Sequence, residues 1–584
     1  MLAKAPLYAY YLALNQWVMG ERAAGLFLAH LSQLAMGALT CGLTYLLGRR
    51  VFGQTVGVVA GVLAALYSPG IYRDGQLLDT ALATLLATCF LLALLAALKE
   101  ATPTRWFGSG LPLGLLGLTR PNLLLLAPLA LALMVAWLRM QAPASTRRRM
   151  AMAFLLGTVL PILLITGRNY LITGGLVPIS STGGINFYTG NNPDSDGCSP
   201  IPAGIAWQRT LYEAMSAGAE SGGAQDAYWR AKALRFWRQQ PRRALALLVR
   251  KVYLYWNAYE IPNNVSYDWG RQHASVLRIV PFTFAVIGPL GLLGIALAGW
   301  RRRDAQALTL FVVVQMIAVA IFFVCARYRM PMIPVLCVFA AFGLTEVVRF
   351  ARARHWSALA LSALAAAAFG LLVNSDVYGI RASRAANRDW YWLGESYLLA
   401  GDYEQAKEAS RRATLQDPAD ADAYALLGSA CMQTGQLTAA AWYMLRALDL
   451  APDFATVAAT LAGLYLQEDW PLEEPERLVR RALEHRPRNV AAWAALVRLN
   501  ARRGELQEAA ANLERAQAAL ASWNRQDTRW AQMQDLLLQA MAEARVAGMP
   551  MSETVTSPEL GPGTGRAGGE AASRTYMESE ALDQ

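Results

Sequence analysis

Apolar runs of about 20 residues, separated by short bursts of arginine, fill the first two thirds of the chain. About 20 apolar residues in a helix cross the hydrocarbon core of a bilayer. Because no water there can satisfy backbone N–H and C=O groups, such runs must be helical. The sequence therefore predicts an all-α membrane domain over residues 1–373. Its spans are expected at 24–47, 51–68, 77–97, 150–166, 276–300, 308–325, 331–348 and 356–373, with an outward-pointing hairpin of two shorter runs, 107–118 and 123–138.

The composition supports a polytopic membrane protein and excludes a soluble one. Of 584 residues, 55% are hydrophobic and only 16% are charged. The net charge of +11 does not indicate nucleic-acid binding, because the arginines gather in short loops at 49–50, 147–149, 301–303 and 349–354. Basic loops of this kind stay in the cytoplasm. The orientation that follows is a multi-pass protein of a bacterial-type inner (plasma) membrane in the cell envelope. Residue 1, the loop 167–275 and everything after 374 then lie outside.

The reactive side chains exclude two further classes of site. Six cysteines are scattered without a CxxC or Cys/His spacing, and the chain has four histidines. Neither a disulfide framework nor a zinc site is indicated. Glycines recur every four residues at Gly53, Gly57 and Gly61, which predicts close packing of that span against a neighbouring helix.

A repeat of about 34 residues begins after the last span. Trp390, Gly394, Tyr397, Ala406 and Pro418 fit the tetratricopeptide pattern, and three further copies follow to about residue 516. Such two-helix units stack into an α-solenoid with a concave face that binds peptides or proteins. The sequence therefore predicts a repeat domain over 383–544 with a protein partner. Residues 550–584 have few apolar side chains, which predicts a disordered tail.

The stretch 167–197, GRNYLITGGLVPISSTGGINFYTGNNPDSDG, is expected to form a structured loop directly outside a span. Glycine, asparagine and aspartate allow tight turns, and no helical or strand period is visible. Two interpretations stay open: a wall of a binding site at the membrane surface, or a solvated turn.

Charged residues lie at several of the expected outer span ends. A set of arginines with a few acids on one face suits a phosphate ligand, since guanidinium groups grip phosphate oxygens and a carboxylate can act as a base. Each also has a simpler interpretation: Arg327 and Arg329 can reach lipid headgroups, and Asp79 can cap the third span. The candidates here are Arg73, Asp74, Asp79, Arg120, Arg168, Asn169, Arg327 and Arg329.

The membrane part resembles the C-superfamily glycosyltransferases, the polytopic enzymes related to protein mannosyltransferases and aminoarabinose transferases. The resemblance rests on PLYAYYLAL at 6–14, LLGRRVFG at 46–53, YRDGQLLDTAL at 72–82, the loop ending GGINFYTGNNPDSDG, and RYRMPMIPVL at 327–336. It implies transfer of a sugar from a polyprenyl-phosphate donor to an acceptor lipid, glycan or protein on the outer face. It also implies an inverting displacement with a carboxylate base and, often, a divalent metal ion.

The resemblance assigns roles to the candidates. Asp79 falls where the family has its second acidic residue and is the expected catalytic acid. Arg73, Asp74, Arg120, Arg168, Asn169, Asn186, Asn191, Asn192, Arg327 and Arg329 are expected to bind substrate, with the three later asparagines contacting sugar hydroxyls or shaping the loop.

One departure separates two hypotheses of function. Family members have a first span and an outer loop with the principal catalytic Asp before the PLY stretch, whereas here Pro6 nearly follows Met1. We therefore expect either a start further upstream or a chain without catalysis. The first hypothesis is a membrane glycosyltransferase whose repeats recruit an acceptor or partner. The second is a non-catalytic, membrane-anchored repeat scaffold.

Overall fold

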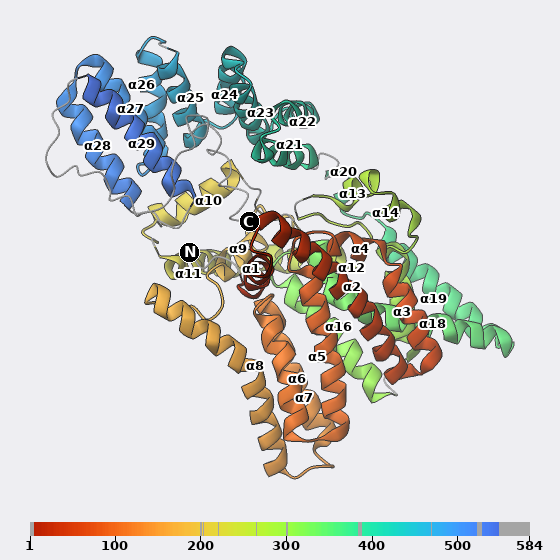
Figure 1. Cartoon of the computed structure of the whole chain (residues 1–584). Coiled ribbons are helices and arrows are strands. Elements are labelled where there is room, and N and C mark those ends of the chain that lie inside the picture. Colours follow the sequence, from red (N-terminus) through yellow and green to blue (C-terminus); the bar gives the residue numbers. More distant parts are fainter. Residues whose placement is uncertain are drawn as a thin grey trace. The chain divides into compact units, whose positions relative to one another are not determined.

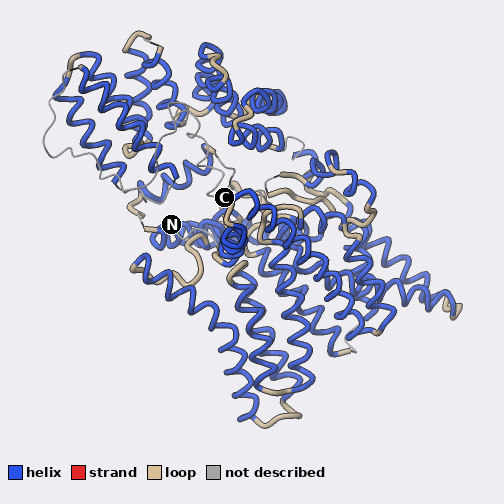
Figure 2. Tube along the Cα trace, viewed as in Figure 1, coloured by secondary structure: helices blue, strands red, loops and turns tan. Residues whose placement is uncertain are grey.

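The computed structural model describes residues 5–198, 201, 204–219, 221–263, 265–298, 302–383, 388–468, 470–521 and 528–547. The prediction of an all-α fold is confirmed, because the described residues form helices joined by short loops, with one isolated bridge between Tyr67 and Phe282 (Figures 1 and 2). The predicted tail at 550–584 lies outside the described residues. Contacts divide the chain into two units: a membrane unit, and a repeat unit that begins at about residue 386.

Within the described residues, seven helices are long and apolar enough to cross a membrane. Each corresponds to an expected span or to the second half of the expected hairpin. They are α2 (Arg22–Phe52), α5 (Thr80–Glu100), η1 with α7 (Pro121–Leu125 and Leu126–Leu138), α8 (Ala144–Thr173), α16 (Arg303–Ala320), α17 to α18 (Ala326–Arg329, Met330–Met332 and Ile333–Arg352) and α19 (Trp356–Asn374).

Three of the expected runs are shorter helices. The run at 51–68 forms α3 (Gln54–Ala65), which is followed at once by α4 (Ser68–Asp74). The run at 276–300 is broken into α14 (Ser275–Ile279) and α15 (Phe284–Ala298), and the hairpin's first half is α6 (Pro103–Gly117). Prolines explain the outer breaks, because proline donates no backbone hydrogen bond: Pro69 stands at the start of α4, and Pro281 between α14 and α15.

Glycines let the membrane helices approach closely. A Cβ atom added at Gly110 of α6 would overlap the carbonyl oxygen of Phe154 on α8, and one at Gly57 would come 2.8 Å from the carbonyl oxygen of Tyr45 on α2. Gly61 also faces Tyr45, so the predicted packing role of the glycine series holds for Gly57 and Gly61. Gly53 does not pack; its φ of +105° breaks the chain between α2 and α3.

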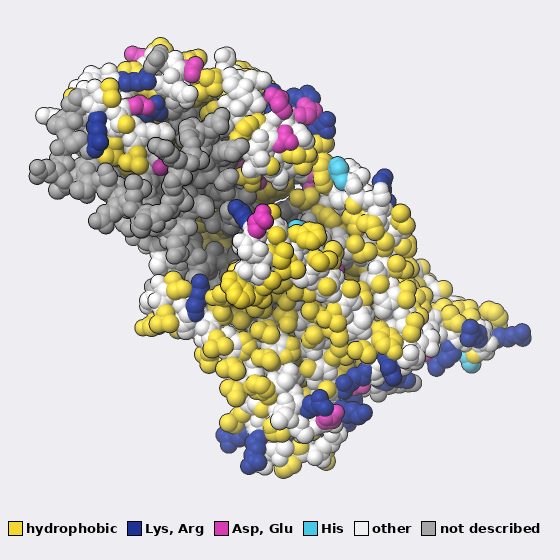
Figure 3. All heavy atoms as spheres, in the orientation of Figure 1, with side chains coloured by type: hydrophobic (Ala, Val, Ile, Leu, Met, Phe, Trp, Pro, Cys, Tyr) yellow, Lys and Arg dark blue, Asp and Glu magenta, His cyan; other side chains and the backbone are white. Residues whose placement is uncertain are grey.

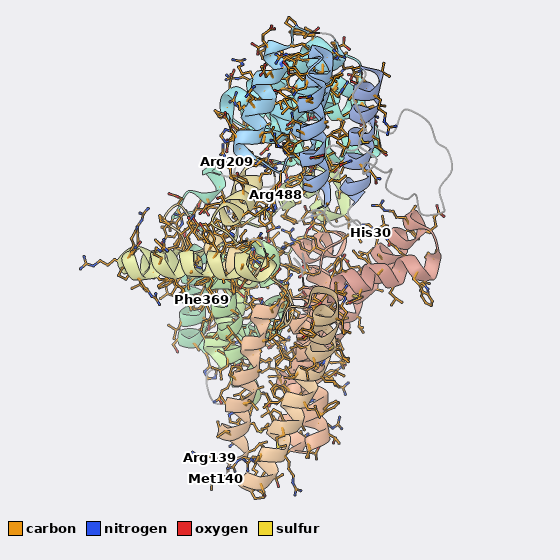
Figure 4. The ribbon with its side chains drawn as sticks, turned by 90° about the vertical axis from the view of Figure 1, so that its left-hand side faces the viewer. His30, Arg139, Met140, Arg209, Phe369 and Arg488 are labelled. Atoms are coloured by element: carbon orange, nitrogen blue, oxygen red, sulfur yellow. The ribbon has the colours of Figure 1, made fainter. Side chains whose placement is uncertain are left out.

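The two ends of the membrane unit differ in charge. Lys and Arg side chains gather at its lower end in Figure 3, where the turn between α7 and α8 carries Arg139 and Met140 (Figure 4). A belt of hydrophobic side chains lies above that end on the face shown in Figure 3. This is the pattern expected of a bilayer-facing belt with basic loops at one end.

The loop 167–275 is more helical than the sequence suggested. Helix α8 continues to Thr173, so Arg168 and Asn169 lie in its last two turns and not in a loop. A short helix, α9 (Gly183–Thr189), then interrupts the expected irregular stretch. Next come α10 (Ile205–Ser216), α11 (Gly222–Gln239), α12 (Pro241–Trp256) and α13 (Tyr267–His273).

The repeat unit contains the four predicted helix pairs. They are α21 (Asp389–Ala400) with α22 (Tyr403–Gln416), α23 (Ala421–Gln433) with α24 (Leu437–Leu450), α25 (Ala455–Gln467) with α26 (Glu473–His485), and α27 (Val490–Arg503) with α28 (Leu506–Ala521). A further helix, α29 (Thr528–Val546), packs on α27 and α28. Buried alanines and leucines from successive pairs form a continuous core. Residues 201–213, which hold most of α10, group with this unit and not with the membrane helices.

Candidate active site

A cluster of charged side chains forms where several membrane helices begin or end. Helix α6 ends at Gly117, and the proline-led turn η1 starts at Pro121, which leaves Arg120 at the break. Asp79 immediately precedes α5, Arg327 lies in the short helix α17, and Arg73 lies in α4. Helix ends leave backbone groups unpaired, so these positions can hold polar side chains that a continuous span could not.

Arg120 and Asp79 form a two-pronged ion pair. Arg120 Nε lies 3.2 Å from Asp79 Oδ2, and Arg120 Nη2 lies 3.4 Å from Asp79 Oδ1. Arg120 Nη2 also donates to Thr80 Oγ1, and Nη1 donates to the carbonyl oxygen of Arg327 at 3.0 Å. The arginine side chain is 4% exposed and the aspartate side chain 22%. Asp79 occupies the N-cap position of α5 but makes no side-chain capping bond, so the capping interpretation is not observed.

The charge of Asp79 is set by its surroundings. Burial opposes ionisation, but the guanidinium groups of Arg120 and Arg327 outweigh it and hold the pKa of Asp79 below its ordinary value. Asp79 is therefore a carboxylate near neutral pH. One edge of it stays accessible to a hydroxyl or another small polar group.

Arg120 and Arg327 both act on that carboxylate. Burial raises the pKa of the Cys325 thiol, and the positive charges of Arg327, Arg73 and Arg120 oppose that rise. Arg120 and Arg327 both lie over the ring of Tyr328, at 5.4 and 4.9 Å from its centroid. With Asp79 as the paired acid, the cluster keeps an excess of positive charge.

Two donor atoms in this cluster lack partners among the described residues. They are Nε of Arg327 and Nη2 of Arg73, both buried. Each of these side chains has one other donor atom with a partner: Arg327 Nη2 donates to Tyr328 Oη at 3.0 Å, and Arg73 Nη1 donates to Gln76 Oε1 at 2.8 Å. Buried donors without acceptors are costly in a folded protein, and an anionic ligand would satisfy them.

Arg329 belongs to a different arrangement, although it is only two residues from Arg327. Its Nη2 donates to Glu260 Oε1 at 2.7 Å and its Nη1 to the carbonyl oxygen of Asn257 at 2.6 Å. Both side chains of the ion pair are buried, at 3% and 6% exposure. Arg329 thus fastens the turn after α12 to α17. Sequence reasoning missed Glu260, whose only signal was an acid inside the aromatic stretch KVYLYWNAYEIP.

Asp74 also lies apart from the arginine cluster. Its carboxyl group packs against Gly37 of α2. Burial alone raises the pKa of Asp74 to about 7, and no arginine charge counteracts that rise.

The asparagines of the loop hold its shape. Asn169 Nδ2 donates to the carbonyl oxygen of Val177 at 2.9 Å, and Asn192 Nδ2 donates to that of Tyr188 at 2.9 Å. Asn191 Nδ2 donates to the carbonyl oxygen of Ile321 at 2.8 Å, which ties the loop to the segment before Arg327. Asn186 is exposed on α9.

Arg168 stands beside α1 (Leu7–Met19) and not in the arginine cluster. Its guanidinium lies 5.9 Å from the ring centroid of Tyr10.

A buried lysine completes the support of the site. Lys251 Nζ donates to the carbonyl oxygens of Gly190 and Phe322, at 3.0 and 2.9 Å, and to Asn191 Oδ1 at 3.1 Å. Burial lowers its pKa to about 8. Lys251 lies on the buried face of α12 with Ala244, Leu247 and Leu254. The helical spacing of these four residues is the sequence signal that indicates burial of the lysine.

A divalent metal ion does not fit this cluster. Both oxygens of Asp79 are engaged by Arg120, and the nearby charges are guanidinium groups that would repel a cation. The described residues contain no group of three or more His, Cys, Asp or Glu side chains placed to hold a metal ion. We therefore derive no step through a metal.

Comparison with known proteins assigns the two parts of the chain. Residues 3–166 match the family described as dolichyl-phosphate-mannose-protein mannosyltransferase. Residues 390–420 and 421–454 each match the tetratricopeptide repeat. The N-terminal part of the chain is thus similar to this mannosyltransferase family, and its C-terminal part contains tetratricopeptide repeats, as the sequence motifs predicted. No curated protein matches the chain.

Three solved structures show a partial likeness to the chain. The apo oligosaccharyltransferase of Archaeoglobus fulgidus is 16% identical, with 68% of this chain and 50% of that chain covered and a TM-score of 0.36. The same organism's oligosaccharyltransferase AglB, in complex with an inhibitory peptide and a dolichol-phosphate, is 15% identical. The match covers 69% of this chain and 51% of that chain, with a TM-score of 0.37. This chain spans about half the length of both. MamA AMB-1 is 23% identical, and the match covers 27% of this chain and 84% of that chain, with a TM-score of 0.21.

Proposed function

We propose that this protein is a membrane glycosyltransferase that moves a sugar from a polyprenyl-phosphate donor to an acceptor outside the cytoplasm. The observation that carries the proposal is the two-pronged pair of Arg120 with the carboxylate of Asp79, together with the buried, unpaired donor atoms of Arg327 and Arg73. These residues come from turns far apart in the sequence. The match of residues 3–166 to a mannosyltransferase family supports the same activity.

The arrangement suits departure of a phosphate from a sugar. As the bond between the sugar carbon and the phosphate oxygen breaks, negative charge grows on the lipid phosphate. The unpaired donors of Arg327 and Arg73 are already fixed and buried, so they would stabilise that charge without reorganising. Asp79, held as a carboxylate, would accept a hydrogen bond from the acceptor hydroxyl and orient it.

The test is transfer from a polyprenyl-phosphate sugar by purified protein, expressed with any in-frame residues encoded upstream of Met1. Asp79→Asn should lower transfer per amount of folded protein by about 100-fold or more. Asp74→Asn is the matched control and should retain most of the activity. Equal transfer by wild type and Asp79→Asn would remove Asp79 from the site. No transfer from any donor would favour the repeat scaffold.

The orientation is part of the proposal and has its own test. Cys198 is buried and cannot report sidedness, so a cysteine is placed at the exposed Asp194 of the outer loop. An impermeant thiol reagent should label that cysteine in intact cells, and should label one at Arg302 only after lysis. The reverse pattern would place the loop and its neighbouring cluster in the cytoplasm.

A further inference from the structure

Helix α10 is part of the repeat unit although the membrane unit contributes the chain on both sides of it. Residues 201–213 group with the repeats, whereas residues 1–200 and 214–385 group with the membrane helices. Ile205 is 8% exposed and belongs to the apolar core of the repeats, with Ala421 and Ala425 of α23. The loop 167–275 therefore contributes residues 201–213 to the repeat unit, and the chain then continues in the membrane unit.

Two carboxylates at successive repeats hold α10. The backbone N–H of Ile205 donates to Asp422 Oδ1 at 2.9 Å, at the start of α23. One turn along α10, Arg209 forms a two-pronged ion pair with Asp453, which lies just before α25; its two distances are 2.6 and 2.5 Å (Figure 4 marks Arg209). Helix α10 thus runs across the starts of two consecutive repeats.

The residue directly before α10 must be a glycine. Gly204 has a φ of +94°, a conformation that residues with a side chain rarely adopt. A Cβ atom at this position would also overlap the carboxylate of Asp422. The backbone at 204–205 can reach the buried carboxylate only because residue 204 is glycine.

We propose that α10 is an intramolecular ligand of the repeats, and that this surface recruits an external polypeptide helix that displaces it. The expected partner has the same chemistry: a glycine at the helix start and an arginine five residues later, to meet Asp422 and Asp453. Displacement is feasible because the Arg209 side chain is 52% exposed, and ion pairs with such exposure contribute little binding free energy. The tether still favours α10, because a linked ligand competes at a high effective concentration.

The test uses a fluorescent peptide of residues 201–219 added to the purified full chain in detergent. Arg209→Glu in the chain should release α10, so the peptide should bind this variant at least about tenfold more tightly than wild type. Peptide carrying the same Arg209→Glu change should bind neither chain. Arg235→Glu, at an exposed arginine of α11 in the same loop, is the matched control and should behave as wild type.

Hydrogen–deuterium exchange checks the release itself. Amides of α10 should exchange about tenfold faster in Arg209→Glu and in Gly204→Val, and the charge-swapped pair Arg209→Glu with Asp453→Arg should regain protection. Unchanged exchange in both single variants would overturn the docking. Faster exchange without tighter peptide binding would overturn the proposed recruitment surface.

Discussion

Two buried ion pairs of the membrane unit and two exposed ion pairs of the repeats differ in what they contribute to stability and function. Arg120–Asp79 and Arg329–Glu260 are mostly or fully buried, and each arginine makes further hydrogen bonds to backbone carbonyls. On the repeats, Arg477–Glu474 and Arg411–Glu408 are largely exposed pairs within one helix. A buried charge is expensive and must be matched, whereas an exposed pair is screened by water. Similar residue pairs therefore predict very different effects of substitution.

The largest effect is expected at Arg120. Arg120→Gln removes the charge that pairs with Asp79 and should lower sugar transfer by about 100-fold or more. The measurement is initial transfer rate per amount of folded protein. Arg105→Gln is the control, because Arg105 pairs with Glu100 at the opposite end of α5 and both are exposed. Equal losses in the two variants would contradict a site at Arg120.

Arg329 should affect stability instead. Arg329→Leu leaves Glu260 buried without a partner and should cost about 3–5 kcal/mol of unfolding free energy. Adding Glu260→Leu should restore most of that loss, as measured by thermal unfolding in detergent. Normal stability of Arg329→Leu combined with lost transfer would instead return Arg329 to the substrate site.

Lys251 should give an intermediate effect with a defined pH dependence. Lys251→Met removes the donor to the carbonyl oxygens of Gly190 and Phe322, while Asn191 Oδ1 still accepts from Trp237 Nε1, and should cost about 1–3 kcal/mol. Because the folded pKa is about 8 and the ordinary value 10.5, the unfolded chain retains this proton between those pH values while the folded chain releases it. The contribution of Lys251 to stability should therefore rise with pH across that window and be constant below pH 8.

The Lys251 dependence is checked by thermal midpoints between pH 7 and 10. The slope should be absent in Lys251→Met and present in the control Arg238→Met, an exposed residue of α11. A slope that persists in Lys251→Met would assign it to another group.

The smallest effect is expected on the repeat surface. Arg477→Ala removes a pair whose side chains are 71% and 49% exposed and should change the unfolding free energy by less than about 1 kcal/mol. The thermal transition of the repeats in the full chain is the measurement. A shift of the thermal transition as large as that caused by Arg329→Leu would contradict the proposed difference between buried and exposed ion pairs.

The sequence by itself determined the helical class, the positions of most spans and the repeats. Length of apolar runs, arginine bursts and a 34-residue period are local properties, and backbone hydrogen bonding leaves little choice of structure for them. It also identified Asp79, Arg120 and Arg327 as charges at span ends.

Only the tertiary structure decided which of these charges meet. It joined Arg120 to Asp79, diverted Arg329 to Glu260 and turned Asp74 toward α2, because partner choice depends on helix packing across long sequence separations. It also gave Lys251 and α10 their roles. Helical spacing could indicate that Lys251 is buried, but its acceptors and the carboxylates that hold α10 come from distant segments, and no local pattern encodes those.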